Sequence, residues 1–101
     1  VSQQVVDWMW DIFLQSSPLA AQSLGDLGPL DQRATLAALN VPILSYVGAK
    51  DEIVDPAVCR SVADYGADVT LVECPESGHA PFIEEPELYL RELLGFVAAR
   101  L

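Results

Sequence analysis

The chain has 101 residues, of which 51% are hydrophobic and 20% are charged, and its 15 acidic against 5 basic residues give a formal net charge of −10. This apolar share excludes an intrinsically disordered chain, and the length allows one domain at most. A surface for nucleic acid or for an anionic membrane needs clustered basic residues, whereas the lysine and arginine residues here are scattered, so we expect neither partner. No apolar run is long enough to span a bilayer.

The cysteines and the single histidine show no metal-binding pattern. Cys59 and Cys74 lack a C-x-x-C spacing and a second histidine, so we expect no zinc site, no disulfide framework, no other metal and no cofactor. We interpret both cysteines as buried thiols in a reducing compartment, which favours the cytoplasm. Met9, the only methionine, lies inside a helical pattern, so we expect that the chain does not begin where its gene begins.

The N-terminal part of the chain predicts helices and loops but no strand. Apolar residues recur at helical spacing over residues 1–15, namely Val5, Met9, Ile12 and Phe13. Residues 16–30 are rich in serine, glycine and proline, which is typical of short helical turns and loops. A second short helix is expected over residues 31–39, capped by Asp31.

The remainder of the chain predicts the order strand, helix, strand, helix. Residues 41–47 and 69–74 are runs of strand-forming residues, and Pro42, the second residue of the first run, lies near the start of the strand, where a proline is tolerated. Asp55 and Pro56 mark the start of one crossover helix, and Pro86 marks the start of an amphipathic helix that runs to the end. A crossover of this length predicts a parallel βαβ unit.

Two parallel strands do not make a sheet that is stable by itself. Parallel sheets need both faces covered and need further strands to pair their backbone groups. No further strand is evident before residue 41. We therefore expect an α/β fold that is incomplete without a partner chain or a second copy.

Asp51 and His79 follow the two predicted strands at the edge where ligands bind in parallel sheets. Adjacent strands lie about 4.8 Å apart, so the two side chains can meet. A carboxylate beside an imidazole fixes the tautomer of the ring and stabilises the imidazolium that forms when histidine accepts a proton from a nucleophile. Alternatively, His79 is a surface residue without a function, and Asp51 only favours the dipole of the next helix. Glu52 is a rival for the role of the acid.

Two segments resemble motifs of the α/β-hydrolase fold family. Residues 41–51 are similar to the strand and acid loop of that family, v-P-v-L-x-x-x-G-x-x-D, and residues 78–87 are similar to its histidine loop, G-H-x-x-x-x-E-x-P-E. The resemblance implies that Asp51 is the acid and His79 the base of a catalytic triad. Glu84 and Glu85, which belong to the second motif, are interpreted as structural residues near a helix N-terminus.

The resemblance also implies a domain organisation. Residues 41–101 correspond to the last two parallel strands and the helices of an α/β-hydrolase sheet. Residues 1–40 match only loosely, at the position where the family has the end of a helical lid.

The chain departs from the family in one respect that decides its mechanism. It contains no G-x-S-x-G nucleophile elbow, and the oxyanion-hole loop of the family is missing as well. We therefore expect a hydrolase of small-molecule esters, thioesters, amides or lactones that is active only with an N-terminal chain of the same precursor, which carries the oxyanion hole and a nucleophile expected to be serine. Alternatives are a non-catalytic ligand-binding or scaffolding member of the same fold, and an acyltransferase.

Overall fold

The computed structural model describes residues 1–101, which form two compact units, Val1–Asp31 and Gln32–Leu101. The division falls earlier in the sequence than the expected boundary after residue 40. The reason is that helix α3 (Arg33–Ala38) contacts α5 (Val62–Tyr65) and so belongs to the second unit. The assignment of residues 1–40 to a lid stays a prediction.

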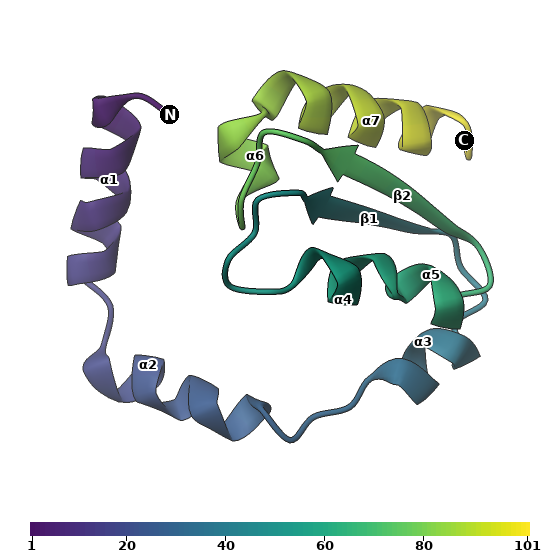
Figure 1. Ribbon diagram of the computed structural model, residues 1–101, viewed down its shortest axis with the longest axis horizontal. Coiled ribbons are helices and arrows are strands. Elements are labelled where there is room, and N and C mark those ends of the chain that lie inside the picture. The colour runs from purple at the N-terminus through teal and green to yellow at the C-terminus, as the bar shows by residue number, and fades with distance from the viewer. The chain divides into compact units, whose positions relative to one another are not determined.

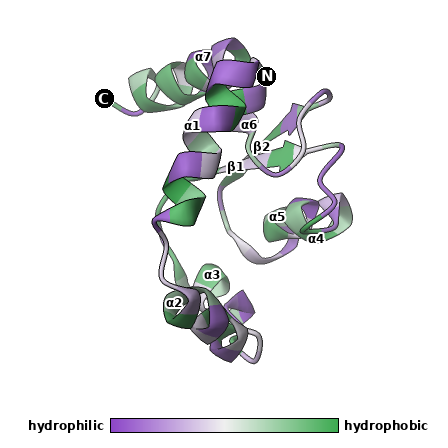
Figure 2. Cartoon of the chain, turned by 90° about the vertical axis from the view of Figure 1, so that its left-hand side faces the viewer, coloured by the Kyte–Doolittle hydropathy of each residue, from purple (hydrophilic) through white to green (hydrophobic).

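The first unit consists of helices that begin at serine residues. Ser2 Oγ accepts the backbone N–H of Val5 at 3.3 Å, and Ser17 Oγ accepts that of Ala20 at 3.4 Å, as serine does at helix N-termini. Hydrophobic and hydrophilic residues alternate along the first helix (Figure 2). The elements are α1 (Gln3–Leu14), α2 (Pro18–Ser23) and the 3₁₀ helix η1 (Leu24–Leu27). The predicted helix over residues 1–15 and the short turns after it are thereby confirmed.

The second unit contains two parallel strands that pair in register along their whole length. They are β1 (Ile43–Gly48) and β2 (Val69–Cys74), so the predicted parallel pair is confirmed. β1 begins after Pro42, because proline has no N–H to donate, and the N–H of Ile43 donates to Asp68 O at 2.8 Å.

Helices cover both faces of this sheet (Figure 1). α4 (Pro56–Arg60) and α5 form the crossover on one face, and α6 (Pro81–Glu84) and α7 (Pro86–Ala98) lie on the other. Asp55 caps α4 as predicted, since its Oδ1 accepts the N–H of Ala57 at 2.8 Å. None of the helices is long and apolar enough to cross a membrane.

Three helix boundaries differ from the sequence-based expectation. The last helix, α7, ends at Ala98 and does not run to the end of the chain. The expected single crossover helix is interrupted at Ser61, whose hydroxyl donates to Val58 O at 2.6 Å and so competes with the regular backbone pattern. The N-cap of α3 is Gln32 rather than Asp31. Thr35 Oγ1 donates to Gln32 Oε1 at 2.8 Å, which joins the first turn of α3 to that residue.

The core is small and lies at the carboxyl ends of the strands. Its buried residues are Val47, Gly48, Val72, Cys74, Ser77 and Pro81. Tyr46 joins β1 to α7, because its hydroxyl donates to Tyr89 O at 2.6 Å and the two rings stack with centroids 4.3 Å apart. The apolar stripe predicted for the last helix is only partly covered, since several of its members are exposed: Leu90, Leu94 and Val97.

Gly48, the last residue of β1, lies directly against the backbone of the loop that follows β2. A Cβ atom at this position would overlap Gly78 O and would lie 2.9 Å from Ser77 O. Both neighbours are backbone atoms, so they cannot move aside as a flexible side chain can. We predict that Gly48→Ala lowers the free energy of unfolding by about 1–3 kcal/mol, as overpacking does.

Urea unfolding of the protein as expressed from its own gene measures this difference. Gly95→Ala is the matched control, because Gly95 lies inside α7 and a Cβ there meets nothing within 4 Å. Alanine at that helical position should raise the free energy of unfolding by about 0.5–1 kcal/mol. Equal unfolding curves for the two variants would contradict the role of Gly48.

Candidate active site

Asp51 lies in the loop after β1 and is held by backbone donors. Its Oδ1 accepts the N–H of Ile53 at 2.8 Å and the N–H of Val54 at 3.0 Å, and only 6% of the side chain is exposed. The N–H of Val54 lowers the pKa of Asp51 most, His79 and Ile53 lower it further, and desolvation opposes them. The carboxylate is therefore ionised at neutral pH and acts only as a hydrogen-bond acceptor.

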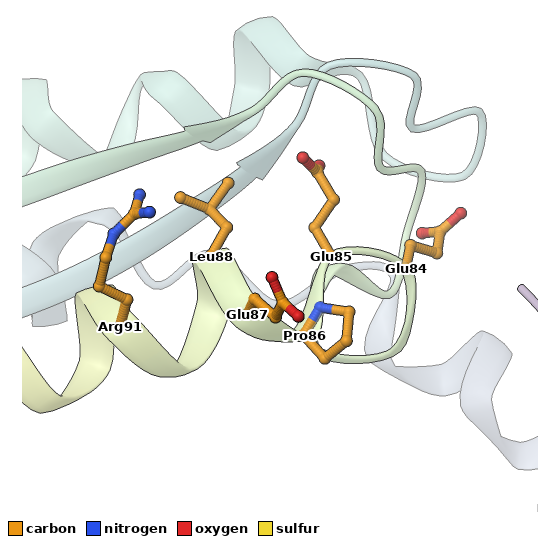
Figure 3. Close-up of a pocket in the computed structure, with 6 residues that line it drawn as sticks. All are labelled: Glu84, Glu85, Pro86, Glu87, Leu88 and Arg91. Atoms are coloured by element: carbon orange, nitrogen blue, oxygen red, sulfur yellow. The ribbon is translucent and has the colours of Figure 1, made fainter.

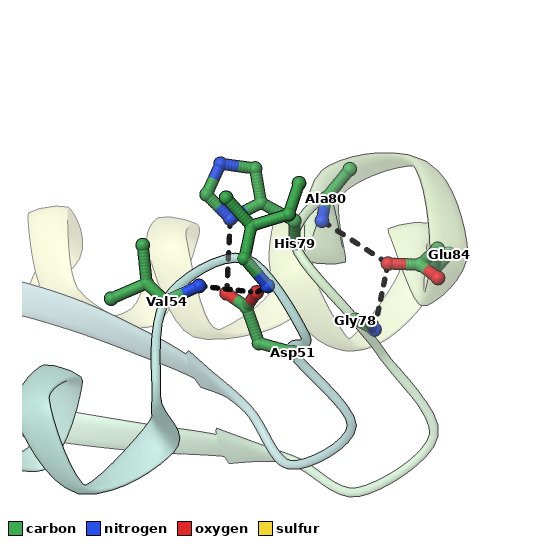
Figure 4. A network of polar contacts seen from close by, with 7 residues as sticks. Asp51, Val54, Gly78, His79, Ala80 and Glu84 are labelled. Carbon is green, nitrogen blue, oxygen red and sulfur yellow. Dashed lines mark hydrogen bonds and ion pairs between the residues drawn. The ribbon is translucent and has the colours of Figure 1, made fainter. Parts of the chain in front are cut away.

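His79 lies in the loop after β2 and contacts this carboxylate. Its Nδ1 is 3.0 Å from Asp51 Oδ2. Because an ionised carboxylate has no proton to donate, Nδ1 carries the proton and donates it. The lone pair of the neutral ring is then on Nε2, which points away from Asp51 (Figure 4). Since 53% of the histidine side chain is exposed, this nitrogen can reach a reacting group.

Hydrogen bonds between the backbones of the two loops bring these side chains together. The strand pair ends at Gly48 and Cys74, and the N–H of Ala49 still donates to Cys74 O at 3.0 Å. One residue further, the N–H of Lys50 donates to Ser77 O at 2.9 Å. The structure thus places Asp51 and His79 side by side, as their positions after neighbouring strands predict; their catalytic roles stay predictions.

Two carboxylates from the end of α6 fasten the histidine loop. Glu84 Oε2 accepts the N–H of Gly78 at 2.8 Å and that of Ala80 at 3.1 Å. Glu85 Oε2 accepts the Ser77 hydroxyl at 2.5 Å and the N–H of Glu76 at 3.1 Å. Sequence reasoning interpreted both glutamates as structural but did not find these contacts. The sequence did contain a signal for these contacts. The loop after the second strand has several backbone N–H groups that need acceptors, and two glutamates follow it closely.

The rival residues do not form a comparable pair. No hydrogen bond or ion pair joins Glu52 to His79, whereas Asp51 makes one. The two cysteines are weak nucleophiles as well. Desolvation raises the pKa of the buried Cys74 thiol and of the partly buried Cys59 thiol. Both thiols therefore stay protonated at neutral pH. No group of three or more histidine, cysteine, aspartate or glutamate side chains is arranged to hold a metal ion.

An open pocket at the junction of α6 and α7 does not include the Asp51–His79 pair (Figure 3). Arg91, its one basic side chain, donates to Glu92 Oε1 at 3.1 Å. The residues that line it are Glu84, Glu85, Pro86, Glu87, Leu88 and Arg91. We therefore place the candidate chemistry at His79 rather than in this pocket.

The arrangement defines a class of site. Two parallel strands present an ionised aspartate and a histidine at their carboxyl ends, with Nδ1 of the histidine on the carboxylate and Nε2 accessible. A pair with this geometry can serve as the acid and the base of a nucleophile–histidine–acid triad.

Comparison with known proteins points to hydrolases. No family model matches the chain. A pimeloyl-[acyl-carrier protein] methyl ester esterase from Pectobacterium atrosepticum is 36% identical over 69 residues, which are 68% of this chain and 27% of that protein. The esterase of the same name from Chromobacterium violaceum is 32% identical over 71 residues, or 70% of this chain and 28% of that protein. A protein named as a carbamate hydrolase from Variovorax paradoxus is 35% identical over 75 residues, which are 74% of this chain and 28% of that protein.

These relatives are α/β-hydrolases, and this chain spans about a quarter of their length. The parallel strand pair with helices on both faces is consistent with part of that fold. The similarity therefore agrees with the α/β arrangement of this part of the chain.

The hydrogen bond between Asp51 and His79 predicts the tautomer of the histidine. At a pH at which the ring is neutral, ¹⁵N NMR should find the proton on Nδ1, because the acceptor is an ionised carboxylate. The signal is assigned by its loss in His79→Gln. Asp51→Ala should abolish the downfield Nδ1–H resonance, and a proton on Nε2 in the unaltered protein would refute the geometry.

The lowered pKa of Asp51 predicts a pH dependence of stability. Because the folded-state pKa lies below the unfolded value of about 3.9, the contribution of Asp51 is complete above the unfolded value and is lost as pH falls through the folded one. The difference in free energy of unfolding between the unaltered protein and Asp51→Asn should therefore be constant near neutrality and shrink below about pH 5.

Urea unfolding at a series of pH values measures that difference. Asparagine can still accept the N–H groups of Ile53 and Val54, so the substitution removes the titrating group and keeps the turn. Glu52→Gln removes the same charge one residue away without removing a bond to His79, and it controls for net charge. If the free energy of unfolding of Asp51→Asn falls with decreasing pH as steeply as that of the unaltered protein, the ionised carboxylate of Asp51 does not stabilise the folded state as described.

Proposed function

We propose that this chain supplies the acid and the base of a nucleophile–His–Asp triad in a hydrolase of esters, thioesters, amides or lactones. The observation that carries the proposal is the contact of 3.0 Å between His79 Nδ1 and Asp51 Oδ2. The similarity to esterases over about two thirds of the chain supports it.

His79 Nε2 accepts the proton of the nucleophile while the nucleophile attacks the carbonyl carbon of the substrate. The resulting imidazolium then gives this proton to the leaving group, and an acyl intermediate remains on the nucleophile. In the second half, His79 takes a proton from water, the hydroxide attacks the acyl group, and the proton returns to the nucleophile. Asp51 stays ionised throughout and stabilises the imidazolium in each half.

We place the nucleophile and the oxyanion hole outside these 101 residues, on an N-terminal chain of the same precursor, and expect the nucleophile to be serine. None of the serines here stands in a G-x-S-x-G elbow. Ser77, the serine closest to His79 in sequence, is fully buried and donates its hydroxyl proton to Glu85. The relatives are about four times as long as their matched part, which leaves room for such an element.

The relatives, which match the C-terminal part of this chain, are named for a methyl ester and for a carbamate. Both substrates have a carbonyl carbon with an oxygen or nitrogen leaving group. We infer that the shared part carries the proton transfers common to both reactions and that substrate choice depends on other residues. The substrate proposed here is accordingly a class, a small carbonyl compound, rather than one molecule.

The triad assignment predicts the effect of single substitutions on ester hydrolysis. His79→Ala and Asp51→Asn in the protein expressed from its own gene should each lower kcat for a short-chain p-nitrophenyl ester by about 10³-fold or more. Glu52→Gln, which removes a neighbouring acid without a bond to His79, should stay near the unaltered rate. Undiminished turnover by His79→Ala would rule out the assigned base.

A fluorophosphonate probe with mass spectrometry locates the nucleophile in the same preparation. The expected adduct is on a serine outside residues 1–101, and labelling should be slow in His79→Ala. An adduct within the chain would overturn the placement of the nucleophile. Absence of both labelling and turnover would favour the non-catalytic alternative, and ester products formed with added alcohols would favour the acyltransferase.

A further inference from the structure

One carboxylate oxygen holds the backbone on both sides of His79. Glu84 Oε2 accepts the N–H of Gly78 at 2.8 Å and that of Ala80 at 3.1 Å (Figure 4). His79 is the residue between these donors, so its backbone cannot shift without breaking one of the two bonds. We propose that Glu84 is a positioning residue, which sets the place of the imidazole through the backbone. This inference rests on the proposed function, because it concerns the same base.

Helix capping alone explains only one of the two hydrogen bonds. Ala80 is the N-cap residue of α6, and a glutamate early in a helix can accept the N–H of its N-cap residue. Gly78 lies outside the helix, so its bond to the same oxygen holds the loop and not α6. The bond to Gly78 therefore distinguishes a residue that positions His79 from one that only stabilises a helix end.

The one-turn helix α6 gives Glu84 a fixed place from which to reach back to the loop. The N–H of Glu84 donates to Ala80 O at 2.9 Å, and the N–H of Glu85 donates to Pro81 O at 2.9 Å. The carboxylate packs closely on the loop, since a Cβ on Gly78 would lie 3.5 and 3.6 Å from its two oxygens. An ionised acceptor makes stronger hydrogen bonds with N–H groups than a neutral one.

Glu85 holds a different part of the same loop. It binds the Ser77 hydroxyl and the N–H of Glu76, which precede Gly78 and anchor the beginning of the loop. Of the two glutamate side chains, only that of Glu84 binds the residues directly on either side of His79. Loss of Glu84 should therefore leave the loop attached while His79 gains freedom relative to Asp51.

This freedom should affect the rate of the chemical steps more than substrate binding. Proton transfer needs His79 Nε2 at hydrogen-bond distance from the nucleophile, and a displacement of about 1 Å can cost about 100-fold in rate. Glu84 does not touch the substrate in this scheme. We expect a decrease in kcat with little change in KM.

The experiment compares variants in the protein expressed from its own gene. Glu84→Ala should lower kcat for the p-nitrophenyl ester by about 10- to 100-fold, with KM little changed. Glu84→Gln should restore most of the rate, because its amide oxygen can accept both N–H groups. Glu87→Ala, the same substitution on an exposed glutamate whose side chain makes no hydrogen bond in the structure, should leave kcat unaltered. Amide exchange at Gly78 and Ala80 should accelerate in Glu84→Ala alone.

Each outcome decides between defined alternatives. If Glu84→Ala does not fold by circular dichroism, Glu84→Met takes its place, because methionine keeps the length of the side chain and lacks the acceptor. Unchanged kcat in the folded variant, an effect on KM alone, or a Glu84→Gln variant as slow as Glu84→Ala overturns the positioning role. His79→Ala is measured in parallel: if it is fully active, the proposed function itself fails, whereas an inactive His79→Ala beside a fully active Glu84→Ala overturns only the role of Glu84.

Discussion

The continuation of backbone pairing beyond the two strands is the constraint on which the rest of this site depends. The parallel ladder of β1 and β2 ends at Gly48 and Cys74, but hydrogen bonds from Ala49 and Lys50 extend the contact into the loops. Such close backbones leave no room for a side chain at Gly48. Asp51 and His79 therefore lie on loops whose backbones are already hydrogen-bonded to each other, so bringing the two side chains together requires little further ordering of the chain.

The electrostatics of the pair follow from backbone donors rather than from a nearby cation. The basic side chains of the second unit are engaged elsewhere, as in the ion pairs of Lys50 with Glu76 and of Arg60 with Glu73, which are exposed and contribute little to stability. Asp51 instead keeps its charge through the N–H groups of its own loop. Because the N–H donors are neutral, they leave the full negative charge of Asp51 available to a protonated imidazole. A cationic side chain bound to this carboxylate would partly cancel that charge.

The sequence could predict the strands, the parallel order and the positions of the acid and base, because these depend on short-range patterns. Runs of strand formers, a capping aspartate before proline and the two loop motifs are local signals, and the structure has each of these elements in place. The interruption of the crossover helix at Ser61 was not predictable, since it depends on which backbone oxygen accepts the hydroxyl proton of Ser61. The contacts of Glu84 depend on how tightly the α6 turn folds back, which residue order alone does not specify. Periodicity likewise identified an apolar stripe on α7 but not which members are covered.

The small core explains why so much of the site is held by short-range hydrogen bonds. With only six buried residues, side-chain packing can fix little of the geometry around His79. The bonds of Asp51 reach two and three residues along the chain, and those of Glu84 reach four and six. The parallel ladder, its continuation through Ala49 and Lys50, and the bond between Asp51 and His79 span a long stretch of sequence. The two loops that would carry out the proposed proton transfers are thus each held mainly by hydrogen bonds to residues nearby in the sequence, and the strand pair sets the distance between them.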